Sequence, residues 1–166
     1  MNTYQKFSVL LLASLVIFTS GLQAADGTAT LVASRGEVTA NSADVERSLT
    51  QGDSVYVEDQ VTTGDKSFAT LQFIDGAIVT VRPNSKIIIE QYVFNGGDED
   101  AATLNLLEGG LRIITGAMAK TQPESYKVKT PVALMGVRGT EFAIMLCGDQ
   151  ICDEEEEDAS EEESIN

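Results

Sequence analysis

Few residues in this chain could do chemistry, and the two cysteines come first. Cys147 and Cys152 are spaced Cys-Gly-Asp-Gln-Ile-Cys, and the chain has no other cysteine. Thiol oxidoreductases use a tighter, two-residue spacing, and no other soft ligand accompanies the pair. We therefore predict a local Cys147–Cys152 disulfide, which would contribute about 2 kcal/mol through the entropy of the unfolded chain. A redox pair and a metal site are the alternatives.

The acidic residues are the next candidates, because the chain contains no histidine. That absence removes Ser-His-Asp and Cys-His catalysis and histidine zinc sites, but leaves a carboxylate pair possible. Most acids of the body sit beside glycines or in turns, where solvated turn residues are the simpler interpretation. We expect no catalytic residue, cofactor or metal site. The acids considered are Glu37, Asp53, Asp59, Asp65, Asp75, Glu90 and Glu108.

One arginine lies in a setting that suits ligand binding. Arg138 stands among small residues in Val137-Arg138-Gly139-Thr140, and a guanidinium there could bind an anion or a carboxylate. The alternative is structural: Gly136 and Gly139 let the chain turn into the last strand, while Arg138 pairs with an acid of the body. The structural interpretation is favoured, and Arg138 is the candidate for a ligand contact.

The first 24 residues have the layout of a secretory signal peptide. A short segment with Lys6 precedes an apolar run from Phe7 to Thr19, and Ser-Gly-Leu-Gln-Ala ends at Ala24. A membrane anchor needs about 20 apolar residues, and this run is shorter. We predict cleavage after Ala24, a mature chain without a membrane span, and a periplasmic or secreted location.

The charge of the chain excludes one class of partner. The net charge is −15, and loss of Lys6 with the signal peptide would make it −16. Residues 153–166 carry nine of the acids and are predicted to be a disordered acidic tail with weak, unselective cation binding. A nucleic-acid partner would need the opposite field, so we exclude one.

Residues 25–152 read as one all-β domain. Short apolar-alternating runs separated by glycine and aspartate turns extend from Thr28 to Leu146, and they predict a two-layered sandwich, a barrel or a β-solenoid-like fold. The segment Phe68 to Arg82 is predicted to be a hairpin with a two-residue Asp75-Gly76 turn. Lys86 to Val93 is a strand whose Ile87-Ile88-Ile89 would form an adhesive edge if uncovered.

Further strands follow in the same style. Thr103 to Leu107 and Leu111 to Thr115 repeat the strand, turn, strand layout around Glu108-Gly109-Gly110. In the last segment, Thr140 to Leu146, the period-two pattern places Phe142, Ile144 and Leu146 on one side.

The order of the turns and strands carries a resemblance to a known family. The run comprises Arg35-Gly36-Glu37-Val38, Leu49-Thr50-Gln51-Gly52-Asp53, Val61-Thr62-Thr63-Gly64, Ala69 to Arg82, Pro83-Asn84-Ser85, Leu107-Glu108-Gly109-Gly110-Leu111, Val128-Lys129-Thr130-Pro131 and Val137-Arg138-Gly139-Thr140-Glu141-Phe142. Together, from Ala33 to Ile144, these segments resemble the FecR domain family. The resemblance implies an all-β extracytoplasmic module, as in periplasmic sensors that relay receptor occupancy to a sigma factor, and as in stand-alone exported proteins.

Two departures from the sensor pattern bear on function. Only six residues precede the apolar segment, which leaves no room for a cytoplasmic sigma-binding region, and only the acidic tail follows the β domain. We therefore expect a non-catalytic, extracytoplasmic binding module for an envelope protein or an extracellular glycan. A structural role by self-association is the alternative, and a partner chain in FecR-type signalling is a third.

Overall fold

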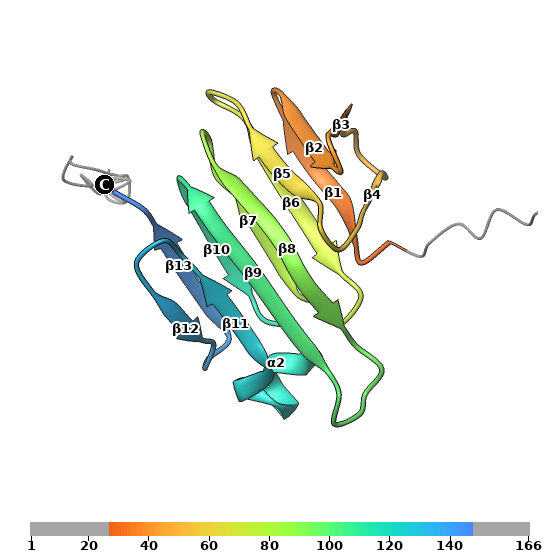
Figure 1. The fold of residues 1–166 in the computed structure, drawn as a ribbon, viewed down its shortest axis with the longest axis vertical. Coiled ribbons are helices and arrows are strands. Elements are labelled where there is room, and N and C mark those ends of the chain that lie inside the picture. Colours follow the sequence, from red (N-terminus) through yellow and green to blue (C-terminus); the bar gives the residue numbers. More distant parts are fainter. Residues whose placement is uncertain (1–26, 148–166) are drawn as a thin grey trace, which may run out of the picture.

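The structure, a computed structural model, describes residues 27–147 and consists of two β-sheets packed face to face (Figure 1). The all-β prediction is confirmed, and the two layers form a sandwich. The predicted signal peptide (1–24), the acidic tail (153–166) and Cys152 lie outside the described residues. Within residues 27–147, no helix is long and apolar enough to cross a membrane.

Sheet A has six strands in the order β13-β10-β7-β6-β1-β4. Its strands are β1 (Ala29–Arg35), β4 (Ser54–Val55), β6 (Phe68–Phe73), β7 (Ile78–Val81), β10 (Gly110–Ile114) and β13 (Glu141–Met145). The two ends of this sheet are the short β4 and the late β13.

Sheet B has seven strands in the order β12-β11-β9-β8-β5-β2-β3. Its strands are β2 (Val38–Ser42), β3 (Val45–Ser48), β5 (Gln60–Thr63), β8 (Lys86–Val93), β9 (Ala101–Glu108), β11 (Tyr126–Lys129) and β12 (Leu134–Gly136). The ends of this sheet are therefore β3 and β12.

Pairing distinguishes the sandwich from the solenoid alternative. Stacked solenoid coils need parallel neighbours, whereas β9 with β11 is the one parallel pair among the described strands. The chain reaches that position through α2 (Ala117–Thr121) and the 3-10 helix η1 (Pro123–Ser125), at one end of the sandwich (Figure 1). A parallel neighbour needs such a crossover.

The β6–β7 hairpin is confirmed, but its predicted two-residue turn is wrong. The Phe73 N–H donates to the Ala77 carbonyl over 2.8 Å, and the Gly76 N–H donates to the Phe73 carbonyl over 2.9 Å, which leaves a three-residue loop. Gly76 has a φ of +84°, and Asp75 has no positive φ. This is the longer hairpin type, with glycine in the left-handed position.

Gly109 carries the chain from one sheet to the other. The predicted strands around it exist, but β9 belongs to sheet B and β10 to sheet A. Gly109 has a φ of +74°, and a Cβ there would lie 2.2 Å from Ser85 Oγ. Ser85 Oγ instead accepts the Gly110 N–H over 2.8 Å. A glycine at this corner is thus required by both backbone and space.

The hydrophobic core lies between the two sheets and accounts for the alternating strands. Ile87 and Ile89 of β8 are fully buried in it. The adhesive edge expected for an uncovered strand does not arise here, because β8 is paired on both sides, with β5 and with β9. The prediction for the last strand is confirmed: Phe142, Ile144 and Leu146 share one side and pack against the core while remaining partly exposed.

Candidate interaction site

The β12 edge of sheet B is short and exposed, and no strand within residues 27–147 pairs with its outer side. β12 pairs with β11 alone. The Thr130 N–H donates to the Ala133 carbonyl, and the Val137 N–H donates to the Tyr126 carbonyl. In an antiparallel ladder, alternate residues point their backbone groups to the partner, so those of Leu134 and Gly136 point outward. An edge of this kind can pair with another strand.

A groove of about 680 Å³ lies beside this edge. The β11–β12 connection forms its apolar wall, with Val132 87% and Leu134 62% exposed. It is lined by Glu90, Asn105, Leu107, Lys129, Thr130, Pro131, Val132, Ala133 and Leu134, none of which is aromatic. Large aliphatic side chains held this far into water are a feature of interaction surfaces.

Three polar side chains from neighbouring strands are joined within this groove lining. Lys129 of β11 forms an ion pair with Glu90 of β8, and the Asn105 side-chain amide donates to the second Glu90 oxygen over 2.8 Å. The hydrogen bond from Lys129 lowers the pKa of the Glu90 carboxyl below its ordinary value. Both partners of the ion pair are partly exposed, so a ligand can reach them.

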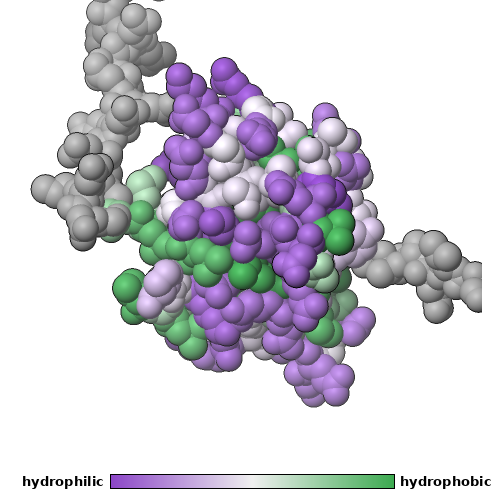
Figure 2. Space-filling view, turned by 45° about the horizontal axis from the view of Figure 1, so that its top comes forward, coloured by the Kyte–Doolittle hydropathy of each residue, from purple (hydrophilic) through white to green (hydrophobic). Residues whose placement is uncertain are grey.

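Hydrophobic surface is not confined to this groove. Figure 2 shows it as a band across one face of the molecule, with hydrophilic surface on both sides. Met145 of the β13 edge is 48% exposed, and Ile114 of the adjacent β10 is 37% exposed.

The C-terminal part of the fold is also its basic part. Within residues 110–147, five Lys and Arg residues outnumber two Glu residues, whereas residues 27–109 have five basic residues against thirteen acidic ones.

Arg138 lies on the surface and is already paired. Its Nη2 is 2.7 Å from Glu124 Oε1, and both side chains are largely exposed, at 79% and 83%. This is the pairing with an acid of the body that the structural interpretation expected. The groove lining does not include Arg138, so the sequence candidate and the groove are separate features. Whether Arg138 contacts a ligand stays a prediction.

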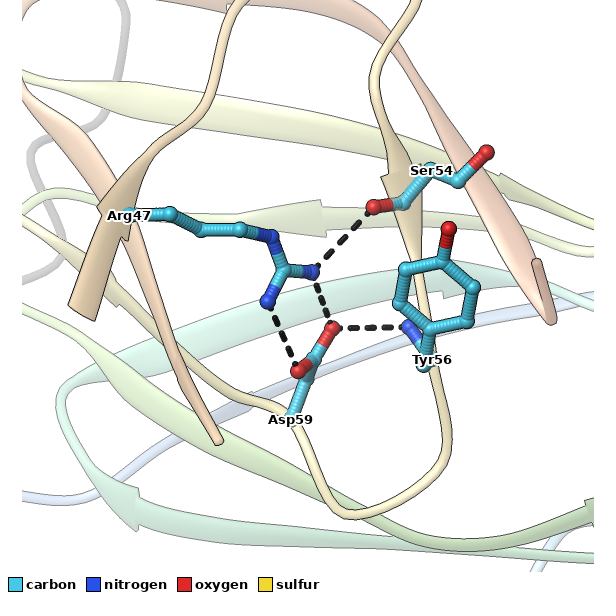
Figure 3. A network of polar contacts seen from close by, with 4 residues as sticks. All are labelled: Arg47, Ser54, Tyr56 and Asp59. Carbon is cyan, nitrogen blue, oxygen red and sulfur yellow. Dashed lines mark hydrogen bonds and ion pairs between the residues drawn. The ribbon is translucent and has the colours of Figure 1, made fainter. Parts of the chain in front are cut away.

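Asp59 was expected to be a solvated turn residue, and the structure corrects this. Asp59 is fully buried and accepts hydrogen bonds from both terminal nitrogens of Arg47, over 3.0 and 2.5 Å (Figure 3). It also accepts the Tyr56 N–H over 2.7 Å, while Arg47 donates to the Ser54 carbonyl over 3.2 Å. The hydrogen bonds that Arg47 donates to Asp59 raise the pKa of Arg47. The cluster fastens the β4–β5 connection to β3.

Asp75 is a second buried carboxylate at a predicted turn. It accepts the Tyr92 hydroxyl over 2.5 Å, the Ala77 N–H over 2.9 Å and the Met118 N–H over 3.2 Å. This draws the hairpin loop against the start of α2, which explains why Asp75 does not adopt the exposed two-residue turn. Burial raises the pKa of Tyr92. Neither Asp59 nor Asp75 is bonded to a second carboxylate in the described structure.

The remaining site prediction is only partly covered by the described residues. Cys147 is the last of them and lies directly after β13, with its Sγ 4.0 Å from the Met145 carbonyl oxygen. Cys152 is outside the described residues, and the disulfide therefore stays a prediction. Across residues 27–147, no group of three or more histidine, cysteine or acidic side chains is arranged to hold a metal ion.

The sequence reasoning missed the groove at the β12 edge. Its signal was present in the run Pro131-Val132-Ala133-Leu134, where apolar residues directly follow a proline turn. An apolar run normally indicates a buried strand, and only the fold shows that this one ends a sheet with no described strand beyond it.

Comparison with known proteins gives one match. No curated protein and no solved structure is similar to this chain. The family model described as FecR protein matches residues 59–157, which takes in β5 to β13 and the whole groove lining. Because the match covers more than half of the 166 residues, this chain belongs to the FecR protein family.

Proposed function

We propose that this chain is a non-catalytic, extracytoplasmic interaction module that binds another protein at the groove beside β12. The exposed aliphatic wall of that groove carries the proposal. Its Val132 and Leu134 side chains are largely exposed, and no described part of the chain covers them. Membership of the FecR family supports a signalling or interaction role.

The chemistry of the groove favours a protein over a glycan. Sugar-binding sites commonly stack aromatic rings on the sugar, and no aromatic side chain lines this groove. The free backbone groups of Leu134 and Gly136 offer the hydrogen bonds of strand addition, and the Lys129–Glu90–Asn105 cluster offers polar contacts. A protein partner whose strand pairs with β12 fits these features.

The location and the disulfide belong to the same proposal. The signal-peptide layout of residues 1–24 supports export with cleavage after Ala24, and an oxidising compartment would favour the Cys147–Cys152 bond. Intact mass spectrometry of the exported protein checks both features at once. We expect the mass of a chain that begins at Ala25 and has two hydrogen atoms fewer than the dithiol form, and two alkylatable thiols would contradict the disulfide.

The binding role is tested by affinity capture from an envelope extract at low and moderate salt, with the full chain exported through its own leader. A protein that is retained at moderate salt by the native chain but lost with Leu134→Lys supports the proposal. Ile74→Lys is the matched control, since Ile74 is similarly exposed at 53% but lies in the β6–β7 loop. Equal capture by all three chains would contradict it.

A partner chain in FecR-type signalling is the second candidate, and family membership is the observation that favours it. In that case the captured protein would be a receptor or a membrane-bound regulator.

A further inference from the structure

We propose that copies of this chain join head to tail by extending the seven-stranded sheet, with β3 of one copy paired to β12 of the next. The inference rests on the proposed function and names the partner of that site: a second copy of the same chain. Four observations on the two ends of sheet B support it.

The first observation is that the two edge strands have the same number of residues whose backbone groups point outward. The Leu49 N–H donates to the Val38 carbonyl, which sets the alternation of the β2–β3 ladder and points the backbone groups of Glu46 and Ser48 outward. At the other end, those of Leu134 and Gly136 point outward. Two residues on each edge are thus available to pair with two on the other.

The second observation is strand direction. Successive pairings across sheet B are antiparallel except for β9 with β11, so β3 and β12 run in opposite directions within one copy. A second copy placed by translation along the sheet therefore brings its β12 beside β3 in antiparallel order. The outer face of sheet B in the second copy then lies on the same side as in the first. The two layers of the second copy thus continue those of the first.

The third observation concerns the charged side chains that one register of this antiparallel pairing brings together. Glu46 placed opposite Gly136 has no side chain before it, and Lys127 stands directly behind Gly136 on the same face. Glu46 and Lys127 are then two strand spacings apart, about 10 Å between backbones, which their long side chains can bridge. Both are exposed, and no opposite charge of the described chain lies within ion-pair distance of either.

The fourth observation is that, in the same register, apolar surface meets on the opposite face of the paired strands. Val45 is 68% exposed, at the margin of the sandwich on the core side of β3. With Glu46 opposite Gly136, Val45 stands opposite Val137 and beside Met135, which is partly exposed. Val137 is already buried, so pairing the edges would cover Val45 and Met135. Burial of apolar surface is the main favourable contribution to association.

Like edges do not fit as well as unlike edges. Two β3 edges paired about Glu46 would place Glu46 opposite its copy, and two β12 edges would place no acid of β12 beside Lys127. Like charges placed opposite one another destabilise a strand pair. A contact between unlike edges does not close by itself, so we expect species larger than dimers as the concentration rises.

The test is sedimentation velocity of the full chain, exported through its own leader, over a concentration series, with two variants that each block one edge. Val45→Lys blocks β3 and Leu134→Lys blocks β12, and a lysine on an edge strand opposes pairing. Each variant alone should stay monomeric, with its dissociation constant raised about tenfold or more. Because each keeps the edge that the other lacks, an equimolar mixture should form a heterodimer and nothing larger.

Ile74→Lys is the control and should assemble like the native chain. Circular dichroism verifies that each variant is folded. A second pair guards against edge variants that fail to fold: Glu46→Lys and Lys127→Glu should each weaken assembly, and combining them in one chain should restore it.

Other outcomes would overturn head-to-tail assembly. A native chain that stays monomeric at every concentration excludes self-association, yet leaves partner capture from the extract, and with it the proposed function, intact. Dimers formed by Val45→Lys alone would indicate pairing between β12 edges instead. Dimers formed by Leu134→Lys alone would indicate pairing between β3 edges.

Discussion

Two ion pairs in this sandwich join the same kinds of group and differ in burial. Arg47–Asp59 lies near one side of sheet B, where the carboxylate is fully buried and the arginine side chain is 34% exposed. Lys129–Glu90 lies near the other side, with side chains 45% and 30% exposed. The buried carboxylate is satisfied entirely by its own chain, so it holds the fold. The exposed pair can still receive a partner.

The largest effect that separates the two pairs should come from Asp59→Ala. This change leaves Arg47 without its partner and the Tyr56 N–H without its acceptor, and breaking a buried pair costs about 3–5 kcal/mol. Urea unfolding followed by circular dichroism measures the loss. A cost below that of Glu90→Ala would show that burial does not separate the two pairs.

The second-largest loss of unfolding free energy should come from removing Asp75, a buried carboxylate that forms no ion pair in the described structure. Asp75→Ala leaves the Tyr92 hydroxyl and two backbone N–H groups without an acceptor, which we expect to cost about 3 kcal/mol. Tyr92→Phe removes the hydroxyl while keeping the ring, so it should cost less. Urea unfolding of both variants ranks them, and an Asp75→Ala chain as stable as the native one would contradict this role.

Glu90→Gln should reverse the pattern: little loss of stability and a clear loss of binding. The exposed ion pair contributes at most about 1 kcal/mol to folding. The amide keeps the shape but loses the charge that faces Lys129 in the groove. Capture from the envelope extract, measured beside urea unfolding, gives both readings. Asp53→Asn is a control at an exposed, hydrogen-bonded acid outside the groove lining.

The smallest effect concerns acid. An unfolded Glu carboxyl has a pKa of about 4.3. The Lys129 hydrogen bond lowers the folded pKa of Glu90, so its contribution is complete above the unfolded value and disappears as the pH falls through the folded value. Unfolding free energies at neutral and acidic pH should therefore differ slightly less in Glu90→Gln than in the native chain. A larger difference in the variant would reverse the sign.

The strands were predictable because alternation of apolar and polar residues reports directly on half-buried sheet. The segment Lys86 to Val93 is one such strand, and it matches β8 residue for residue. Partners distant in sequence were not predictable. Asp59 and Asp75 look like turn acids until Arg47 and Tyr92 are placed beside them.

The interaction site was hidden for a related reason. Ile87 to Ile89 had the sequence of an adhesive edge but lie in the middle of sheet B, whereas the true edge at Leu134 is only three residues long. Local sequence indicates that a strand exists, and the order of strands decides which one is uncovered.

The central claim, that the β12 side of the sandwich contacts another protein, is tested most directly by site-specific photo-crosslinking in the source cells. A photoreactive residue replaces Val132 in one chain and Ile74 in another, since both side chains are exposed and only the first lines the groove. We predict discrete crosslinked adducts from position 132, either to a second copy or to another envelope protein, and none from position 74. Adducts from position 74 alone, or from neither position, would contradict the claim.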